Sequence, residues 1–242
     1  FPYLNNFVGQ NLPVEFNNTQ GYFPGLPVSV EVEYAVVVSC RTGIVVAGSE
    51  DTNIYVWDFY GTLQWQFALA NPVVSVAMDN YGQYIAAGTR SSLAPVTGSL
   101  WLFDNNLGTP PGNVLWTQTL NVSTSYDGGW AGEESKSVDV KYNYYNQCDI
   151  VAAAHDGGLN LYDQLGNLIW AYTDQYPETI VRISQDGNYI VCASHIGPGA
   201  QMGVHYFSHL RDGVPGWGPA DGTPIWTYYM LDTGGVFWVA IS

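Results

Sequence analysis

The sequence has few charged side chains, and basic residues are the scarcest. Charged residues make up 11% of the 242 residues, whereas an ordinary soluble domain has roughly 25%. Six basic residues stand against 21 acidic ones, which gives a formal net charge of −15 at pH 7. Such a charge repels phosphate backbones and anionic membrane surfaces. Nucleic acid is therefore not an expected partner, and membrane insertion is not expected.

Cysteine and long apolar runs are also scarce. The three cysteines, Cys40, Cys148 and Cys192, form no CxxC, CxxH or vicinal pair, so we expect neither a metal site nor a redox motif. No stretch approaches the roughly 18 to 20 apolar residues of a membrane-spanning helix. Sustained helical periodicity and helix start signals are missing as well. These absences favour an all-β chain.

The scarcity of charged side chains leads to an expectation about where the protein is located. Near pH 2 to 3 most carboxylates are neutral, and a chain with few charges then holds little self-repulsion. We therefore expect an extracellular or cell-surface protein, with an acidic habitat as a hypothesis. The chain starts at Phe1 without a charged segment followed by an apolar one, which predicts export with the leader removed. Sequons at Asn17 and Asn121 are candidate glycosylation sites.

What the chain has in abundance is a repeated phrase rich in aromatic residues. An aromatic strand, a polar turn and a short apolar stretch recur four times, each time ending on a tryptophan: Trp65, Trp116, Trp170 and Trp226. Upstream of each phrase lies a strand end of small residues: VVAGS at 45–49, IAAGT at 85–89, IVAAA at 150–154 and IVCAS at 190–194. A further strand and turn precede each of these. Four antiparallel strands in about 40 to 55 residues are typical of a β-propeller blade.

The repeat divides the chain into blades. After a lead-in or closing segment at 1–34, the blades cover about 35–67, 73–119, 137–173 and 179–230, and the first strand of a fifth follows at 235–242. We expect an all-β propeller, and this chain to be part of a larger one with seven or eight blades. The alternative is a ring of four or five blades whose missing strands come from Leu12–Phe16 or Val28–Tyr34.

The cadence of VVSVAMDNYGQYIAAGT (73–89), GSLWLFDNNLG (98–108) and NVLWTQ (113–118) resembles secreted and archaeal quinoprotein-like propellers, which are also grouped as WD-repeat-like. Dehydrogenases of that group use vicinal cysteines over pyrroloquinoline quinone, with a calcium site. This chain lacks the cysteine pair, so no cofactor is expected, although quinone with calcium stays open. The architecture is also similar to that of tetrathionate hydrolases, but no catalytic motif matches. Of the WD-repeat dipeptides, only Trp57-Asp58 occurs.

Candidate functional residues follow the second strand of each blade. We aligned Glu50, Arg90, His155 and His195 there, with Asp51 and Asp156 beside two of them. Histidine transfers protons near neutral pH, and a neighbouring carboxylate assists it. His155, Asp156, His195 and Arg90 are the candidate catalytic residues, and Glu50 and Asp51 are candidate binding residues. The alternative is a set of turn residues without a common target.

Two loops outside the blade pattern carry further candidates. Trp130 and Trp217 stand among glycines at 121–136 and 208–223, which suits contact with a protein or a glycan. Asp58, Asp104 and Asp163 end the third strands and are expected to cap turns. We therefore expect an extracellular binding or assembly module. Its expected partners are other protein subunits or cell-surface glycans, including further copies in an oligomer or filament. The alternative is a secreted enzyme, either tetrathionate-hydrolase-like or quinone-dependent.

Overall fold

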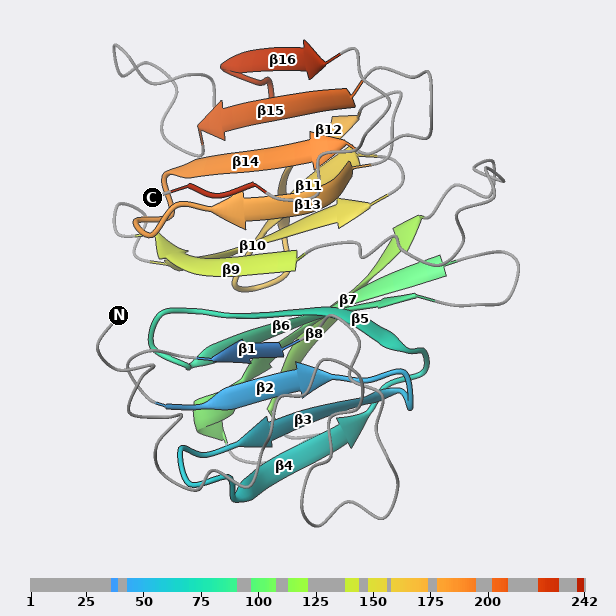
Figure 1. The fold of residues 1–242 in the computed structure, drawn as a ribbon, viewed down its shortest axis with the longest axis vertical. Coiled ribbons are helices and arrows are strands. Elements are labelled where there is room, and N and C mark those ends of the chain that lie inside the picture. The colour runs from blue at the N-terminus through green and yellow to red at the C-terminus, as the bar shows by residue number, and fades with distance from the viewer. Residues whose placement is uncertain are drawn as a thin grey trace.

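The computed structural model consists of four antiparallel sheets of four strands each, which follow one another along the chain (Figure 1). It describes residues 36–38, 43–90, 97–107, 113–121, 138–143, 148–155, 158–173, 178–194, 202–208, 222–230 and 239–241. Within each sheet the strands are hydrogen-bonded in sequence order. Each sheet is therefore one propeller blade, and the expectation of successive four-stranded blades is confirmed.

The strands are short and fall close to the expected segments. Blade 1 holds β1 (Val36–Val38), β2 (Val45–Gly48), β3 (Asn53–Trp57) and β4 (Leu63–Ala68). Blade 2 holds β5 (Val73–Met78), β6 (Tyr84–Arg90), β7 (Thr97–Asp104) and β8 (Val114–Asn121), with the 3-10 turn η1 (Asn105–Leu107). Blade 3 holds β9 (Val138–Asn143), β10 (Cys148–His155), β11 (Gly158–Asp163) and β12 (Leu168–Thr173). Blade 4 holds β13 (Glu178–Ile183), β14 (Tyr189–Ser194), β15 (Met202–Ser208) and β16 (Trp226–Met230).

The first strand of each blade lies on the inside of the arc. β5 packs against both β1 and β9, and β9 packs against β13. Strand periodicity explains the packing, because alternate side chains of each blade face the blade before and the blade after. Val46, Val56 and Trp65 of blade 1 thus form one apolar cluster with Ile85 and Phe103 of blade 2. Equivalent clusters join blade 2 to blade 3 and blade 3 to blade 4.

The glycines at the ends of the second strands have a packing reason. A Cβ on Gly48 would lie 2.4 Å from a methyl carbon of Val73 in blade 2. A Cβ on Gly88 would lie 3.1 Å from a methyl carbon of Val138 in blade 3. Blades converge at this point, so a side chain at either position would push the next inner strand away. The small-residue pattern in the sequence therefore marks the convergence of the blades.

Several expected segments lie outside the described residues or have no strand there. The lead-in at 1–34 is not described, and this includes Asn17, Leu12–Phe16 and Val28–Tyr34. Of the expected fifth-blade strand at 235–242, residues 239–241 are described and have no strand assignment. Val239 is buried against Val191 and Ala193 of β14, on the face of blade 4 that points away from blade 3.

Two further observations concern a buried cysteine and the membrane. Cys192 is buried in the apolar cluster between blades 3 and 4. No helix in the described part of the chain is long and apolar enough to cross a membrane.

Candidate functional site

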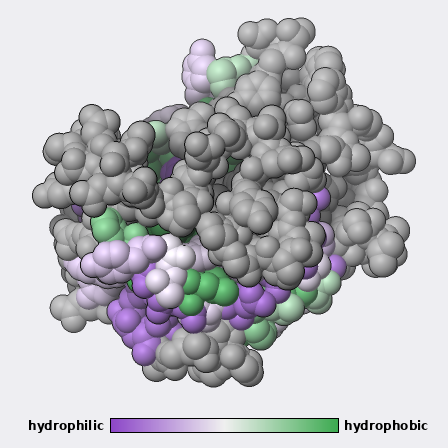
Figure 2. Space-filling model, turned by 60° about the horizontal axis from the view of Figure 1, so that its bottom comes forward, coloured by the Kyte–Doolittle hydropathy of each residue, from purple (hydrophilic) through white to green (hydrophobic). Residues whose placement is uncertain are grey.

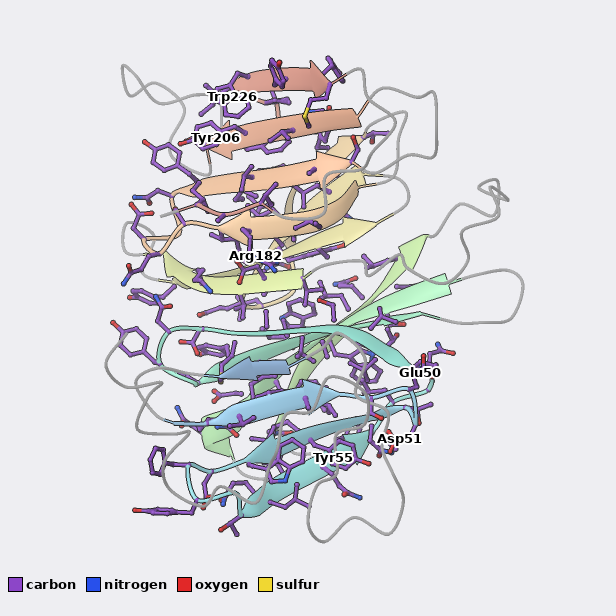
Figure 3. The ribbon with its side chains drawn as sticks, in the orientation of Figure 1. Glu50, Asp51, Tyr55, Arg182, Tyr206 and Trp226 are labelled. Carbon is purple, nitrogen blue, oxygen red and sulfur yellow. The ribbon has the colours of Figure 1, made fainter. Side chains whose placement is uncertain are left out.

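The turns of the propeller lie on two opposite edges (Figure 1). On the first, which we call the Glu50 edge, the second strand of each blade ends and the third begins. On the second, which we call the Tyr60 edge, lie the turns 58–62, 79–83, 163–167 and 184–188, together with η1. Figure 3 places Glu50 and Asp51 on the first edge, and Tyr206 and Trp226 toward the second. Candidate sites therefore have to be judged edge by edge.

On the Glu50 edge, Glu50 and Asp51 form a tight turn between β2 and β3. The Asp51 carboxylate accepts a hydrogen bond from the Tyr55 hydroxyl at 2.6 Å and one from the Asn53 backbone N–H at 2.9 Å. The Asp51 N–H donates to the Ser49 hydroxyl at 3.2 Å. Thr52 closes the turn with a φ of 73°, a backbone conformation that residues other than glycine adopt only at an energetic cost. Asp51 therefore holds its own turn in shape, while Glu50 is exposed.

The electrostatics of this turn follow from those hydrogen bonds. Partial burial alone would raise the pKa of Asp51, but the hydrogen bonds from Tyr55, Asn53 and Ser49 outweigh it and lower the pKa below its ordinary value. Burial, together with the adjacent Asp51 carboxylate, raises the pKa of Tyr55. Asp51 and Tyr55 therefore form a pair of an ionised carboxylate and a protonated phenol, and the phenol donates its hydrogen bond to the carboxylate. A proton-transfer role needs a group that changes charge near the working pH, and this pair does not provide one in neutral solution.

The alignment of the candidate catalytic residues was wrong by one residue in blade 3. In blade 2, Thr89 pairs with Ser99 and Arg90 pairs with Gly98. In blade 3, His155 pairs with Gly158, and this pair occupies the position of the Thr89–Ser99 pair. His155 therefore has the register of Thr89 and Ser194, and sequence position 156 corresponds to Arg90. The alanine run at 152–154 allowed the slip, because a one-residue shift aligns equally small residues.

The structure leaves most of the catalytic hypothesis untested. The backbones of Arg90 and His155 end β6 and β10 on the Glu50 edge, and their side chains are not described. Asp156, His195, Trp130 and Trp217 lie outside the described residues. Asn121 is the last residue of β8, again without a described side chain. Among the residues that are described, no three of His, Cys, Asp and Glu gather as metal ligands would.

Inside the arc, a buried carboxylate joins blades 3 and 4. Asp139 of β9 accepts hydrogen bonds from the backbone N–H of Val140 at 2.9 Å and of Ile183, in β13, at 2.8 Å. Its third partner is the Lys141 ammonium at 3.1 Å. Arg182, beside Ile183, donates to the Val181 carbonyl at 2.7 Å. All these contacts are made to the protein itself, so we assign Asp139 a structural role.

A second buried polar residue joins the same blades farther out. His205 of β15 is fully buried, and its Nδ1 lies 3.2 Å from the Tyr172 hydroxyl of blade 3 and 3.0 Å from the Thr227 hydroxyl. The Tyr172 and His205 rings also contact each other. Nothing in the sequence distinguished His205 from a loop residue, because its burial depends on which blade packs over it.

The Tyr60 edge carries most of the exposed apolar side chains of blades 1 and 3. Tyr60 is 80% exposed and Leu165 is 74% exposed, and they occupy the same position in equivalent turns. Leu63 and Leu168 are exposed at the matching starts of β4 and β12. Exposed apolar neighbours on this edge also include Phe59, Tyr81 and Ile169. Figure 2 shows the end of the molecule with blade 1, where hydrophobic residues lie beside a larger hydrophilic surface.

Rigid turns hold these side chains out. Asp163 Oδ1 accepts the N–H groups of Leu165 and Asn167 at 2.9 and 2.8 Å, and Gly166 supplies the positive φ of 84°. Asp58 does the same for Tyr60 and Thr62, each at 2.9 Å. The expected capping role of Asp58 and Asp163 is confirmed, and Asp104 likewise caps Asn106. The hydrogen-bonded turn therefore holds its apolar side chain exposed to solvent in the unbound protein.

Sequence reasoning missed this edge for a physical reason. Strand starts such as Leu63 and Leu168 look like core residues in a pattern of apolar positions. Only the placement of the blades shows that Trp65 and Trp170, two residues further on, face the next blade while the leucines stay outside. The turn residues Tyr60 and Leu165 carried a usable signal, since an apolar residue between Asp and Gly in a turn has no core to enter.

Comparisons with known proteins support the architecture. No protein-family model matches the chain, and no curated protein matches its sequence. Solved structures do match. The Dos1 propeller aligns over 85% of this chain at 17% identity with a TM-score of 0.55. BamB from Moraxella catarrhalis aligns over 83% at 16% identity with a TM-score of 0.51. Kuenenia stuttgartiensis hydrazine synthase aligns over 87% at 14% identity with a TM-score of 0.56.

These likenesses concern the fold alone, because all three identities are low. The alignments cover 53%, 49% and 53% of the three solved chains, so this chain spans about half the length of the structures it matches. The chain is thus a β-propeller module of successive four-stranded blades. Its role has to be argued from its own surface.

Proposed function

We propose that the chain is a binding and assembly module of the cell exterior, and that its Tyr60 edge is the contact surface for a partner protein. One observation carries the proposal: the row of exposed apolar side chains that repeats on blades 1 and 3. Tyr60 and Leu165 project from equivalent capped turns, and Leu63 and Leu168 follow them at equivalent strand starts. Each of the two blades therefore presents its own exposed apolar pair on this edge, and exposed apolar groups that lie together mark interaction sites.

The chemistry of the row favours a protein over a glycan. Sugar recognition uses the flat faces of exposed aromatic rings and nearby polar groups, whereas leucine side chains offer neither. Protein interfaces bury such aliphatic and aromatic groups within a polar rim. The rim is present, because Gln64, Gln164 and Asn167 flank the row and carry no charge.

Location outside the cell remains part of the proposal. It is supported by the composition, in which uncharged polar residues replace ions, and by the sequons at Asn17 and Asn121. A glycan at Asn121 would lie at the end of β8. Intact-mass measurement of material from the source cells tests this directly, since a glycan adds mass that enzymatic deglycosylation removes.

The binding experiment compares the two edges of the same molecule. Labelled protein is titrated onto envelope fractions from the source cells, with the double variant Leu165→Ser/Leu168→Ser as the test. We expect the variant to bind at least about tenfold more weakly, because it removes two exposed apolar anchors without entering the core. The control is Glu50→Gln, which alters the opposite edge. Equal binding by all three proteins, or a loss with Glu50→Gln only, would overturn the proposal.

The second candidate function is a secreted enzyme, tetrathionate-hydrolase-like or quinone-dependent. It uses the Glu50 edge, where the strand ends at Arg90 and His155 lie on the same side of neighbouring blades. The two functions separate in one assay. Loss of a turnover activity in Arg90→Ala or His195→Ala, with envelope binding intact, would favour the enzyme.

A further inference from the structure

Two turns on the Tyr60 edge place an aspartate beside exposed apolar side chains. Asp58 opens the turn in blade 1, and Asp163 opens the equivalent turn in blade 3. Both aspartates are half-buried. The apolar side chains of the two turns are between 41% and 80% exposed: Tyr60 and Leu63 in blade 1, and Leu165 and Leu168 in blade 3. We call each aspartate with its two apolar residues the acidic-apolar unit of its blade.

The two acidic-apolar units have the same geometry. In each, the apolar residues stand two and five positions after the aspartate. The backbone hydrogen bonds that close the two turns are all 3.0 Å long. Gly61 has a φ of 79° where Gly166 has a φ of 84°. One kind of partner chemistry therefore fits both units.

Each carboxylate is held in place by neutral donors. Two backbone N–H groups of its own turn bind one oxygen of the carboxylate. A side-chain amide binds the other oxygen at 2.9 Å, from Gln64 for Asp58 and from Asn167 for Asp163. These donors position the carboxylate but do not cancel its charge. Since a carboxylate has about four acceptor sites, each aspartate keeps one site for a further donor.

The described part of the chain supplies no cation to these two carboxylates. The basic side chains that it includes are Lys141 on β9 and Arg182 on β13, both on inner strands, and Lys141 pairs with Asp139. Asp104, the matching aspartate of blade 2, is only 8% exposed. An accessible negative charge beside an exposed apolar surface is therefore a feature of blades 1 and 3.

Arginine and lysine side chains match such a unit. Each has an apolar stem and a cationic tip, so a stem that lies on Leu165 and Leu168 brings its cation toward Asp163. An arginine guanidinium also stacks on an exposed aromatic ring such as that of Tyr60. A purely apolar partner would bury the carboxylates without a cation, which costs free energy. An acidic partner would be repelled.

We propose that the segment of the partner protein that binds the Tyr60 edge is rich in arginine or lysine. Its cationic side chains lie along the exposed apolar residues of the two units and end at Asp58 and Asp163. This inference rests on the proposed function and names the chemistry of its partner. The net charge of −15 also attracts such a segment at long range, so added salt should weaken the binding.

A pair of charge-matched double variants tests the proposal. Asp58→Asn/Asp163→Asn removes two negative charges but keeps an acceptor oxygen in each turn, because asparagine caps turns as aspartate does. The control, Glu50→Gln/Asp51→Asn, removes two negative charges from the opposite edge. Labelled proteins are titrated onto envelope fractions from the source cells at about 50 mM and about 500 mM salt. At low salt we expect the Asp58/Asp163 variant to bind at least about tenfold more weakly than the native protein, while the control binds like it.

Two synthetic peptides of equal length test the chemistry of the partner directly. One alternates leucine with arginine, and the other alternates leucine with glutamate. Fluorescence anisotropy measures their binding to the purified chain. We expect the arginine peptide to bind the native protein and the control variant, and to bind Asp58→Asn/Asp163→Asn at least about tenfold more weakly. We expect no binding of the glutamate peptide, and binding of both peptides alike would overturn the proposal.

The envelope titration also separates this inference from the proposed function. If Leu165→Ser/Leu168→Ser binds weakly but Asp58→Asn/Asp163→Asn binds like the native protein, this inference is overturned and the proposed function stands. Equal losses in the two charge variants would also overturn it, because the attraction would then follow the net charge and not the site. If Leu165→Ser/Leu168→Ser binds like the native protein, the proposed function fails and this inference fails with it. Circular dichroism checks that each variant is folded.

Discussion

At the scale of single residues, small polar groups decide the shape of the turns. Asp58 and Asp163 each bind two backbone N–H groups of the turn that follows, and each needs a glycine three residues later. Asp51 does related work on the opposite edge, where Thr52 takes the positive φ instead of glycine. The aspartates of this acidic chain therefore serve largely as acceptors for its own backbone. Their number reflects the number of turns.

Asp51 gives a prediction about pH. Its pKa is lowered in the folded chain, so the ionised form stabilises the fold above the ordinary pKa of 3.8, and this contribution is lost as the pH falls through the lowered value. At pH 7, Asp51→Asn should reduce the free energy of unfolding by about 1 kcal/mol or less, because the group is largely exposed. The difference from the wild type should vanish near pH 2. Urea unfolding at several pH values measures this, and a constant difference would contradict it.

Asp139 is the opposite case, a carboxylate inside the arc. Asp139→Ala removes the acceptor of the buried Val140 and Ile183 N–H groups and leaves Lys141 without its ion pair. We expect a loss of about 3 kcal/mol in the free energy of unfolding, since unpaired buried groups cost 1 to 3 kcal/mol each. The exposed turn residue Asp163 is the control, and Asp163→Ala should cost about 1 kcal/mol. Equal losses would mean that Asp139 does not join blades 3 and 4.

At the scale of elements, the fourth strand of each blade acts as the connector. Trp65 of β4 and Trp116 of β8 face the next blade and donate across the boundary, and Trp170 of β12 packs on Phe207 of blade 4. In β8 the Gln118 side chain adds a bond to the Gly166 carbonyl at 2.8 Å. Blades therefore depend on their neighbours, as in other repeat proteins, where stability is a sum of unit and interface terms. In blade 4 the equivalent tryptophan, Trp226, is 47% exposed.

Two tryptophans in equivalent positions test this connection. Trp116→Ala should lower the free energy of unfolding by about 3 kcal/mol, because the half-buried indole packs on Tyr162 and donates to the Gln164 carbonyl of the next blade. Trp226→Ala should lower it by less than about 1 kcal/mol, because Trp226 is half-exposed. Differential scanning calorimetry provides the measurement. We also expect Trp116→Ala to split the transition, with blades 1 and 2 separating from blades 3 and 4. Similar losses for both variants would contradict the connector role.

At the scale of the whole molecule, the sequence predicted the blades because every blade buries the same faces in the same way. The tryptophan spacing, the small strand ends near Gly48 and Gly88 and the aspartate turns all follow from local rules. The site could not be predicted so well. Which residues stay exposed depends on the neighbouring blade, and this is why Trp226 looked identical to Trp116 in the sequence. The register of His155 was lost in a run of alanines that fits two alignments equally well.

The central claim is that the Tyr60 edge, and not the Glu50 edge, meets the partner. Site-specific photo-crosslinking tests it most directly, with a photoreactive phenylalanine analogue placed at Leu165 in one protein and at Glu50 in another. After irradiation on source-cell envelopes, the account predicts a discrete crosslinked protein from the Leu165 probe and none from the Glu50 probe. A discrete product from Glu50 alone would contradict the claim and move the functional site to the edge that carries Arg90 and His155.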